Sequence, residues 1–217
     1  MVKENPTTRR PGRPKATGID GRESIKRAAL MEFARRGFKG TSIDQIAKTA
    51  EVAKPLISYH FGSKDQLWKQ VVSEAYDEFL RRVLQFVDNQ SQAPDEHPLD
   101  YFITQMVHFA AQRISLIQIS IDEVRQGGER ADWLKTTYLV PLQKNMADHI
   151  LSLPGEESYK RVLASHVIPS VFGAMVFPFI DSDVLLEAYG VDVFSRDYIE
   201  RQAEFIKDLL KAARQNL

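Results

Sequence analysis

The chain has 217 residues, of which 43% are apolar, so it can bury the core of one or two domains. It contains no cysteine, which excludes disulfide bonds, thiolate nucleophiles and cysteine metal sites and is typical of a reducing cytoplasm. The formal net charge is zero, but residues 1–64 carry 14 of the 29 basic and 6 of the 29 acidic side chains, a charge of +8. The remaining 15 basic and 23 acidic residues give −8. A basic N-terminal part followed by an acidic remainder is typical of a DNA-binding protein with a separate regulatory domain.

Residues 1–21 are rich in proline, glycine and basic side chains, and we expect them to form a flexible arm. Within the arm, residues 9–15 resemble an AT-hook, an extended segment that lies in the narrow minor groove of A·T-rich DNA. The residues expected to enter the groove are Arg10, Gly12, Arg13 and Lys15, because its negative potential attracts cations and glycine permits close approach. Pro11 stands where the hook has arginine, so a disordered tail that adds only non-specific attraction stays open.

Residues 22–68, hereafter the head, predict three short helices of a DNA-binding unit. Apolar residues spaced by four predict the first helix over 22–36. We expect the second helix to begin with Thr41 as its N-cap and Asp44 three residues later. The third is predicted over 54–61. Helix, tight turn and helix in this order form a helix-turn-helix, with the recognition helix last.

The predicted third helix leaves a polar side facing outward. Lys54, Ser58, Tyr59 and His60 carry donors that suit phosphate oxygens and base edges in the major groove. A second capping box, Ser63 with the glutamine three residues on, opens the next helix. The head is therefore predicted to bind DNA.

The head closely resembles the TetR family of transcriptional regulators over about fifty residues. The matching residues are Phe33, Gly37, Phe38, Thr41, Ser42, Ile46, Ala47, Val52, Tyr59, His60, Phe61, Ser63, Lys64 and Leu67. Two positions depart from the usual pattern. Glu51 stands where glycine is common in the turn, and Ala53 replaces a common serine at the N-cap of the third helix.

This resemblance assigns roles to individual residues of the head. It implies that Thr41, Tyr59 and Lys64 hold phosphates. It also implies that Lys54, Pro55, Ser58 and His60 approach bases or neighbouring backbone, with Ser42 completing the set of predicted DNA contacts.

Residues 69–217, hereafter the body, are expected to be entirely helical, which makes the fold class all-α. Their apolar spacing continues a long helix to about residue 88 and then predicts helices over about 99–112, 114–126, 130–153, 157–179, 181–189 and 195–215. Pro141 is expected to kink the helix over 130–153. The apolar stretch 162–180 could be mistaken for a membrane span, but its serines, histidine and prolines favour a buried helix, so we expect no membrane partner.

Two body helices are predicted to form a homodimer interface. The segment 159–179 is apolar on more than one face and must be covered on all sides. Together with 195–215 it would form a four-helix contact between protomers, which is also how TetR-like proteins dimerise. A symmetric dimer would place its two recognition helices on the half-sites of a palindromic operator in double-stranded DNA.

The rest of the body is expected to enclose a pocket for an unknown small-molecule effector. The predicted lining combines aromatic, flexible and polar side chains: Phe102, Met106, Phe109, Arg113, Trp133, Tyr138, His149, Phe172 and Met175. For each of them an ordinary core position stays the alternative. Arg113 would meet an anionic effector or pair with Asp122 or Glu123.

The sequence predicts a cytoplasmic, sequence-specific DNA-binding regulator, most simply a repressor that an effector releases from its operator. The alternative is an architectural DNA-binding protein without an effector, in which side chains fill the pocket. An enzyme is not expected, because no acid–base pair, nucleophile motif or phosphate loop is present. Neither a metal nor another cofactor is predicted, since His97 is not paired with a second histidine at helical spacing.

Overall fold

The structure is a computed structural model that describes residues 21–88, 98–152 and 156–215, and within these ranges it contains helices and no strand. The elements of the head and its continuation are α1 (Gly21–Gly40), α2 (Ile43–Thr49), α3 (Lys54–Phe61) and α4 (Lys64–Asp88). Those of the body are α5 (Pro98–Gln112), α6 (Ile114–Gln126), α7 (Glu129–Leu134), α8 (Val140–Ser152), α9 (Glu157–Val162), α10 (Ile168–Ile180), α11 (Ser182–Tyr189) and α12 (Arg196–Gln215). The all-α prediction is confirmed. Of the predicted arm, residues 1–20 lie outside the described ranges, as does His97, whereas Gly21 is the first residue of α1.

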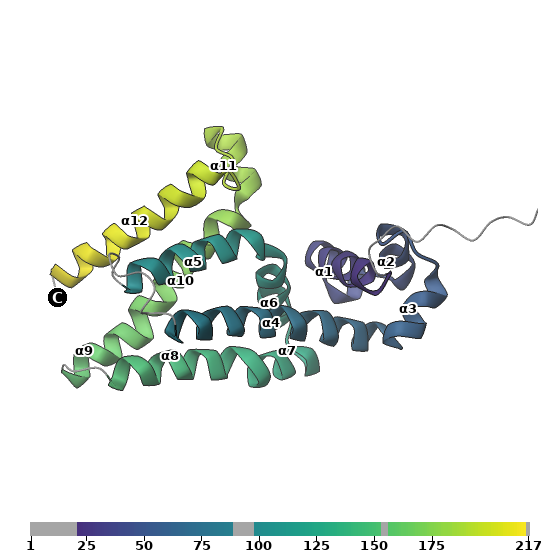
Figure 1. The fold of residues 1–217 in the computed structure, drawn as a ribbon, viewed down its shortest axis with the longest axis horizontal. Helices are drawn as coiled ribbons and strands as arrows, with labels where there is room; N and C mark the ends of the chain where they lie inside the picture. Colours follow the sequence, from purple (N-terminus) through teal and green to yellow (C-terminus); the bar gives the residue numbers. More distant parts are fainter. Residues whose placement is uncertain (1–20, 89–97, 153–155, 216–217) are drawn as a thin grey trace, which may run out of the picture.

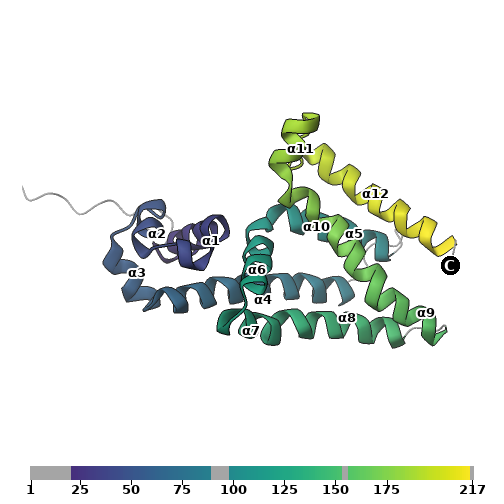
Figure 2. The ribbon, with the colours of Figure 1, turned by 180° about the vertical axis from the view of Figure 1, so that it is seen from behind.

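Helix α4 joins the two parts of the molecule. It begins under the head and runs into the body, where α7 and α8 follow it (Figure 1, Figure 2). The predicted boundary after residue 68 therefore falls inside a continuous helix.

A first hydrophobic core fills the head and continues into the body. In the head it contains Ile25, Phe33, Ile46 and Ile57, all at most 1% exposed. The same core extends through α4 to buried side chains of α6 and α7, including Leu116, Ile119 and Leu134, and to Tyr138. Burial of this apolar surface ties the head to the near end of the body.

A second core lies in the far part of the body, between α5, α10 and α12. Its fully buried members include Ile103, Val107, Phe179 and Ile206. In Figure 2, α10 crosses the body from α9 to the corner at α11, from which α12 runs back along it.

Two predicted helices are interrupted by π-helical segments. The helix expected over 130–153 is divided into α7, the segment η1 (Lys135–Leu139) and α8, and the helix expected over 157–179 is divided by η2 (Leu163–Val167). Pro141 follows the end of η1, at Leu139, by two residues, and Pro169 follows the end of η2, at Val167, by two residues as well. A proline ring clashes with the carbonyl four residues earlier, and the wider π turn provides the room it needs. Where the sequence predicted a kink at Pro141, the structure has the π segment η1 just before the proline.

The segment Lys160–Ile180 is long and apolar enough to cross a membrane by length and composition alone, but this is weak support for a span. Only 18% of its apolar window is buried within the protomer, so the prediction of a fully covered helix is not met by one chain. Phe172 and Phe177 are 54% and 63% exposed, and Phe205 on α12 is 56% exposed.

Candidate nucleic-acid interface

The recognition helix α3 is held by its apolar side. Ile57 and Phe61 are buried in the first core, while Leu56 packs at its edge. Pro55 occupies the first turn, where its missing N–H is not needed, as predicted. Ala53 gives no side-chain cap, and Glu51 in the preceding turn has φ 55°, a left-handed conformation that explains why glycine is common at this position.

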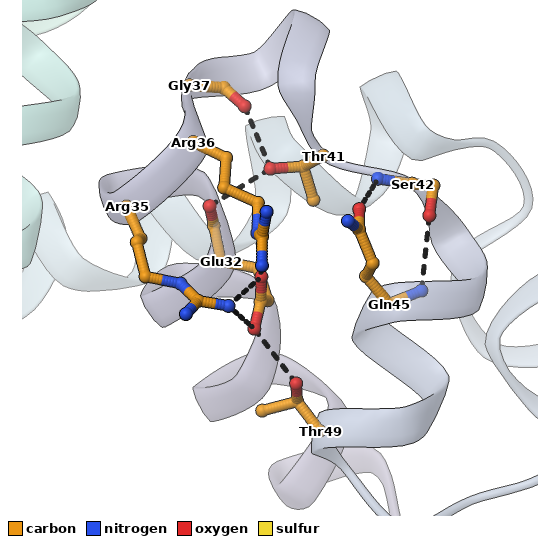
Figure 3. Close-up of polar contacts among 8 residues, drawn as sticks. All are labelled: Glu32, Arg35, Arg36, Gly37, Thr41, Ser42, Gln45 and Thr49. Atoms are coloured by element: carbon orange, nitrogen blue, oxygen red, sulfur yellow. Dashed lines mark hydrogen bonds and ion pairs between the residues drawn. The ribbon is translucent and has the colours of Figure 1, made fainter.

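Helix α2 begins with a capping box that differs from the predicted one. Ser42 is the N-cap: its hydroxyl accepts from the Gln45 N–H at 3.2 Å, and the Gln45 side chain accepts from the Ser42 N–H at 2.7 Å (Figure 3). The prediction that Thr41 caps this helix is wrong. Thr41 is 2% exposed, and its hydroxyl is shared between the carbonyl oxygens of Glu32 at 3.0 Å and Gly37 at 2.8 Å.

Thr41 therefore joins the end of α1 to the start of α2. A phosphate contact from its side chain, which the resemblance implies, would require the hydroxyl to leave two protein carbonyls. In the described state, Thr41 positions Ser42 at the exposed start of α2.

A buried carboxylate fixes α1 against α2. Glu32 is 5% exposed and accepts from Thr49 at 2.9 Å, from Arg36 at 2.9 Å and from Arg35 at 3.1 Å (Figure 3). Desolvation raises the pKa of Glu32, but the hydrogen bonds from Thr49, Arg35 and Arg36 outweigh it, so that the pKa lies below its usual value. The sequence reasoning missed Glu32. The signal was its spacing of seven residues from Ile25, which places it on the apolar face of α1.

The outer face of α3 is open to solvent. Tyr59 is 82% exposed, Lys54, Pro55 and Ser58 are exposed, and His60 is partly buried. The Tyr59 and His60 rings touch with centroids 5.1 Å apart. Lys54 pairs with Asp44 of α2 at 2.9 Å, an exposed ion pair of small energetic weight that a phosphate can replace. These side chains share one surface, as predicted.

Lys64 points into the head in the described state. Its ammonium donates to the carbonyl oxygens of Phe38 at 2.9 Å and Thr41 at 2.8 Å, and it lies 4.3 Å from the centre of the Phe38 ring. Partial burial, together with the positive charge of Arg130, holds the pKa of Lys64 below its usual value. Like Thr41, Lys64 connects the α1–α2 junction rather than facing outward.

The capping box that was predicted at the start of α4 is present in the structure. The Ser63 hydroxyl accepts from the Gln66 N–H at 3.2 Å, and the Gln66 side chain accepts from the Ser63 N–H at 2.9 Å. Gly62, with φ 72°, makes the sharp turn between α3 and α4. A rigid three-helix unit that presents the last helix with polar groups outward defines the class: a helix-turn-helix DNA-binding protein.

Comparison with known proteins agrees with this class and shows which family the head is similar to. Residues 25–71 match the model described as bacterial regulatory proteins, tetR family. The Probable HTH-type transcriptional regulator YttP of Bacillus subtilis (strain 168) is 23% identical over 199 residues, 89% of this chain and 95% of that protein. The biofilm operon icaADBC HTH-type negative transcriptional regulator IcaR of Staphylococcus aureus (strain Newman) is 33% identical over 63 residues, which cover 29% of this chain and 33% of that protein.

Solved structures share the fold over most of the chain. A TetR-like transcriptional regulator from Rhodococcus sp. RHA1 aligns with a TM-score of 0.58 and 18% identity, covering 91% of this chain and 97% of that one. HlyIIR, a hemolysin II transcriptional regulator, aligns with a TM-score of 0.54 and 21% identity, covering 85% of this chain and 95% of that one. Residues 25–71 are thus similar to the DNA-binding domain of TetR regulators, and the chain is a DNA-binding transcriptional regulator.

The predicted effector-binding residues lie in different parts of the body. Trp133 and Tyr138 pack on the first core, whereas Met106 and Met175 belong to the second. Phe109 is buried against Phe79, with ring centroids 4.7 Å apart. Phe102 is partly buried, Phe172 is exposed, and the side chain of His149 lies outside the described part of the structure.

Arg113 pairs with an acidic side chain, which is one of the two roles predicted for it, but the partner is Glu78 rather than Asp122 or Glu123. Its guanidinium donates to both carboxylate oxygens of Glu78, at 2.6 and 2.8 Å. The hydrogen bond from Arg113 outweighs desolvation and holds the pKa of Glu78 below its usual value. Glu78 also accepts from Arg82 at 2.9 Å, so Arg113 is paired within the protein but shares its carboxylate with a second arginine.

Proposed function

We propose that the protein is a homodimeric repressor that binds a palindromic operator and is released by a small-molecule effector. The observation that carries the proposal is the open face of α3, with Lys54, Ser58 and Tyr59 on a head whose helices are locked by capping boxes and by Glu32. In this proposal, residues 22–68 form the DNA-binding domain and residues 69–217 the regulatory body.

The exposed stripe of α10 supports dimerisation. His166 of η2 and Ser170, Gly173 and Phe177 of α10 recur at intervals of three or four residues, and all are exposed within one protomer. A Cβ atom added at Gly173 would meet nothing within 4 Å, so another helix can approach closely there. Phe172 and Phe177, which are exposed on the same helix, add the apolar area that is typical of a protein–protein contact.

The dimer proposal is tested by Gly173→Trp, which places a large side chain where an added Cβ meets nothing within 4 Å in the protomer. We expect sedimentation to show a dimer for the wild type and a monomer for Gly173→Trp, with unchanged helical content. Gln112→Trp, at the exposed end of α5, is the matched control and should stay dimeric. A dimeric Gly173→Trp protein would place the interface elsewhere.

We propose that the effector is uncharged and mostly apolar. Arg113 is already paired with Glu78, so an anionic group would have to compete with that carboxylate for it. The buried aromatic side chains of the body suit an apolar ligand. Thermal unfolding across a panel of apolar and anionic metabolites tests this proposal, and stabilisation by anions alone would contradict it.

The decisive experiment is selection of bound sequences from random duplex DNA at near-physiological salt. A palindrome with half-sites about one helical turn apart is expected from a symmetric dimer. Enrichment of A·T-rich sequences without symmetry would favour the architectural alternative and the arm residues Arg10, Gly12, Arg13 and Lys15. Deletion of residues 1–20 should weaken binding and flatten its salt dependence if the arm takes part.

We place the regulator in the cytoplasm, where it would reach DNA.

A further inference from the structure

Phe38, just past the Gly37 break in α1, lies where the head meets the body. Its ring stacks on Phe33, with centroids 5.9 Å apart, and meets Trp68 of α4 edge-on at 6.4 Å. The guanidinium carbon of Arg130, which belongs to α7 of the body, is 3.6 Å from the centre of the Phe38 ring. Lys64 lies 4.3 Å from the same ring centre. Phe38 is thus a head side chain that a body side chain holds directly.

Arg130 is itself fixed by acidic partners from two helices. Its Nε is 2.9 Å from Oε1 of Glu123 in α6, an ion pair without hydrogen-bond alignment, and Glu123 is 3% exposed. Its Nη1 is 3.8 Å from Asp65 of α4. A planar guanidinium can stack on a ring and pair with carboxylates at the same time, which an ammonium group cannot do. Arg130 therefore joins α1, α4, α6 and α7 at one point.

Aromatic rings continue this contact away from the head. Trp68 touches Trp133 with centroids 5.6 Å apart, Trp133 touches Tyr138 at 5.7 Å, and Tyr138 stacks on Tyr76 at 4.6 Å. Tyr138 lies in the π-helical segment η1. π-Helical turns within α-helices occur frequently at functional sites. A displacement of α7 or η1 would therefore move Arg130 and the rings that support Phe38.

We propose that Arg130 is a positioning residue that sets the orientation of the head on the body and thereby the affinity for the operator. This inference rests on the proposed function. The Arg130 side chain is 21% exposed and engaged with Phe38, Glu123 and Asp65, so it acts through the head rather than by touching DNA. A movement of α6 and α7 is coupled to DNA binding because it changes the relative stability of head orientations.

The test uses the full chain and the duplex that the wild type selects. Arg130→Met keeps the length of the side chain but removes its charge and its plane. Arg125→Met is the matched control, because Arg125 is exposed on neighbouring α6 and pairs only locally with Asp122 among its described contacts. If Arg130→Met does not fold because Glu123 is left unpaired, the double variant Glu123→Gln/Arg130→Met removes the stranded charge.

Two readouts separate positioning from mere stability. The first is operator affinity of the folded dimer, which we expect to fall roughly two- to thirtyfold for Arg130→Met and to stay unchanged for Arg125→Met. The second is tryptophan emission, since the two tryptophans of the chain, Trp68 and Trp133, both lie at this junction. On heating, emission and far-ultraviolet circular dichroism should change together in the wild type, whereas in Arg130→Met emission should change first.

The possible outcomes are distinct. A folded, dimeric Arg130→Met protein with wild-type operator affinity would overturn the inference and leave the proposed function intact. If the wild type selects no sequence, the proposed function fails, and the positioning role is then decided by the unfolding experiment. Coincident transitions in Arg130→Met would overturn it, and separated transitions would support it.

Discussion

Replacing Glu32 by glutamine should loosen the head in a way that depends on pH. The substitution keeps the size of the side chain and an oxygen that accepts from Thr49, but it removes the charge that holds Arg35 and Arg36. Hydrogen bonds to charged groups contribute about 1.5–3 kcal/mol, but exposed ion pairs contribute less than about 1 kcal/mol. Because Arg35 and Arg36 are more than a third exposed, we expect Glu32→Gln to lower the free energy of unfolding by about 1–2 kcal/mol at pH 7.

The sign of the pH dependence follows from the lowered pKa of Glu32 in the folded state. An acid whose pKa falls on folding stabilises the protein fully above its unfolded pKa, about 4.3 for glutamate. That contribution is lost as the pH falls from there through the folded pKa. The difference between wild type and Glu32→Gln should therefore be constant from pH 8 to pH 6 and shrink below about pH 4.5.

The assay is urea unfolding at a series of pH values, followed by circular dichroism. Glu23→Gln is the matched control, because Glu23 lies on the same helix, is 53% exposed and pairs with Lys26 three residues away. Its effect should stay within about 0.5 kcal/mol. A difference for Glu32→Gln that persists unchanged at pH 3.5, or that equals the control at pH 7, would refute the reasoning.

The further predictions concern single side chains. Ala53→Ser should supply the cap that α3 lacks and raise the melting temperature; a lower melting temperature would contradict this. Ser63→Ala should cost about 1 kcal/mol by removing the cap of α4; an unchanged or higher melting temperature would contradict this. Gly62→Ala should destabilise the protein by more than Ser63→Ala, as measured in the same melts, because φ is 72° and the new Cβ would lie 2.3 Å from the Gln66 side-chain oxygen. Burial raises the pKa of Tyr76 to about 12, so stability should fall as the pH rises above about 10, and Tyr76→Phe should show a smaller fall in urea unfolding between pH 9 and 11.

The recognition helix could be predicted from sequence because its signals are local. Pro55 in the first turn and Gly62 after the last determine where α3 begins and ends, and the observed bounds are those predicted. The same holds for the capping box at Ser63, where serine and glutamine stand at the required spacing. The resemblance of the head to TetR regulators likewise rests on residues close together in sequence, among them Tyr59, Ser63 and Lys64.

Capping of α2 shows the limit of local reading. Thr41 and Ser42 are adjacent, and both can cap a helix, so the spacing to Asp44 or Gln45 does not choose between them. The choice depends on α1, whose carbonyl oxygens at Glu32 and Gly37 accept the Thr41 hydroxyl and leave Ser42 free to cap.

The sequence by itself determined the all-α class, the order of the helices and the exposed polar face of α3, because helix periodicity and caps act over a few residues. Only the tertiary structure decided what the charged side chains do. Lys64 reaches back 26 residues to Phe38, Arg113 reaches 35 residues to Glu78, and Arg130 lies on Phe38 from another helix. Such partners are chosen by the packing of helices that are distant in sequence, since burial leaves each charge only the groups that the fold brings within reach.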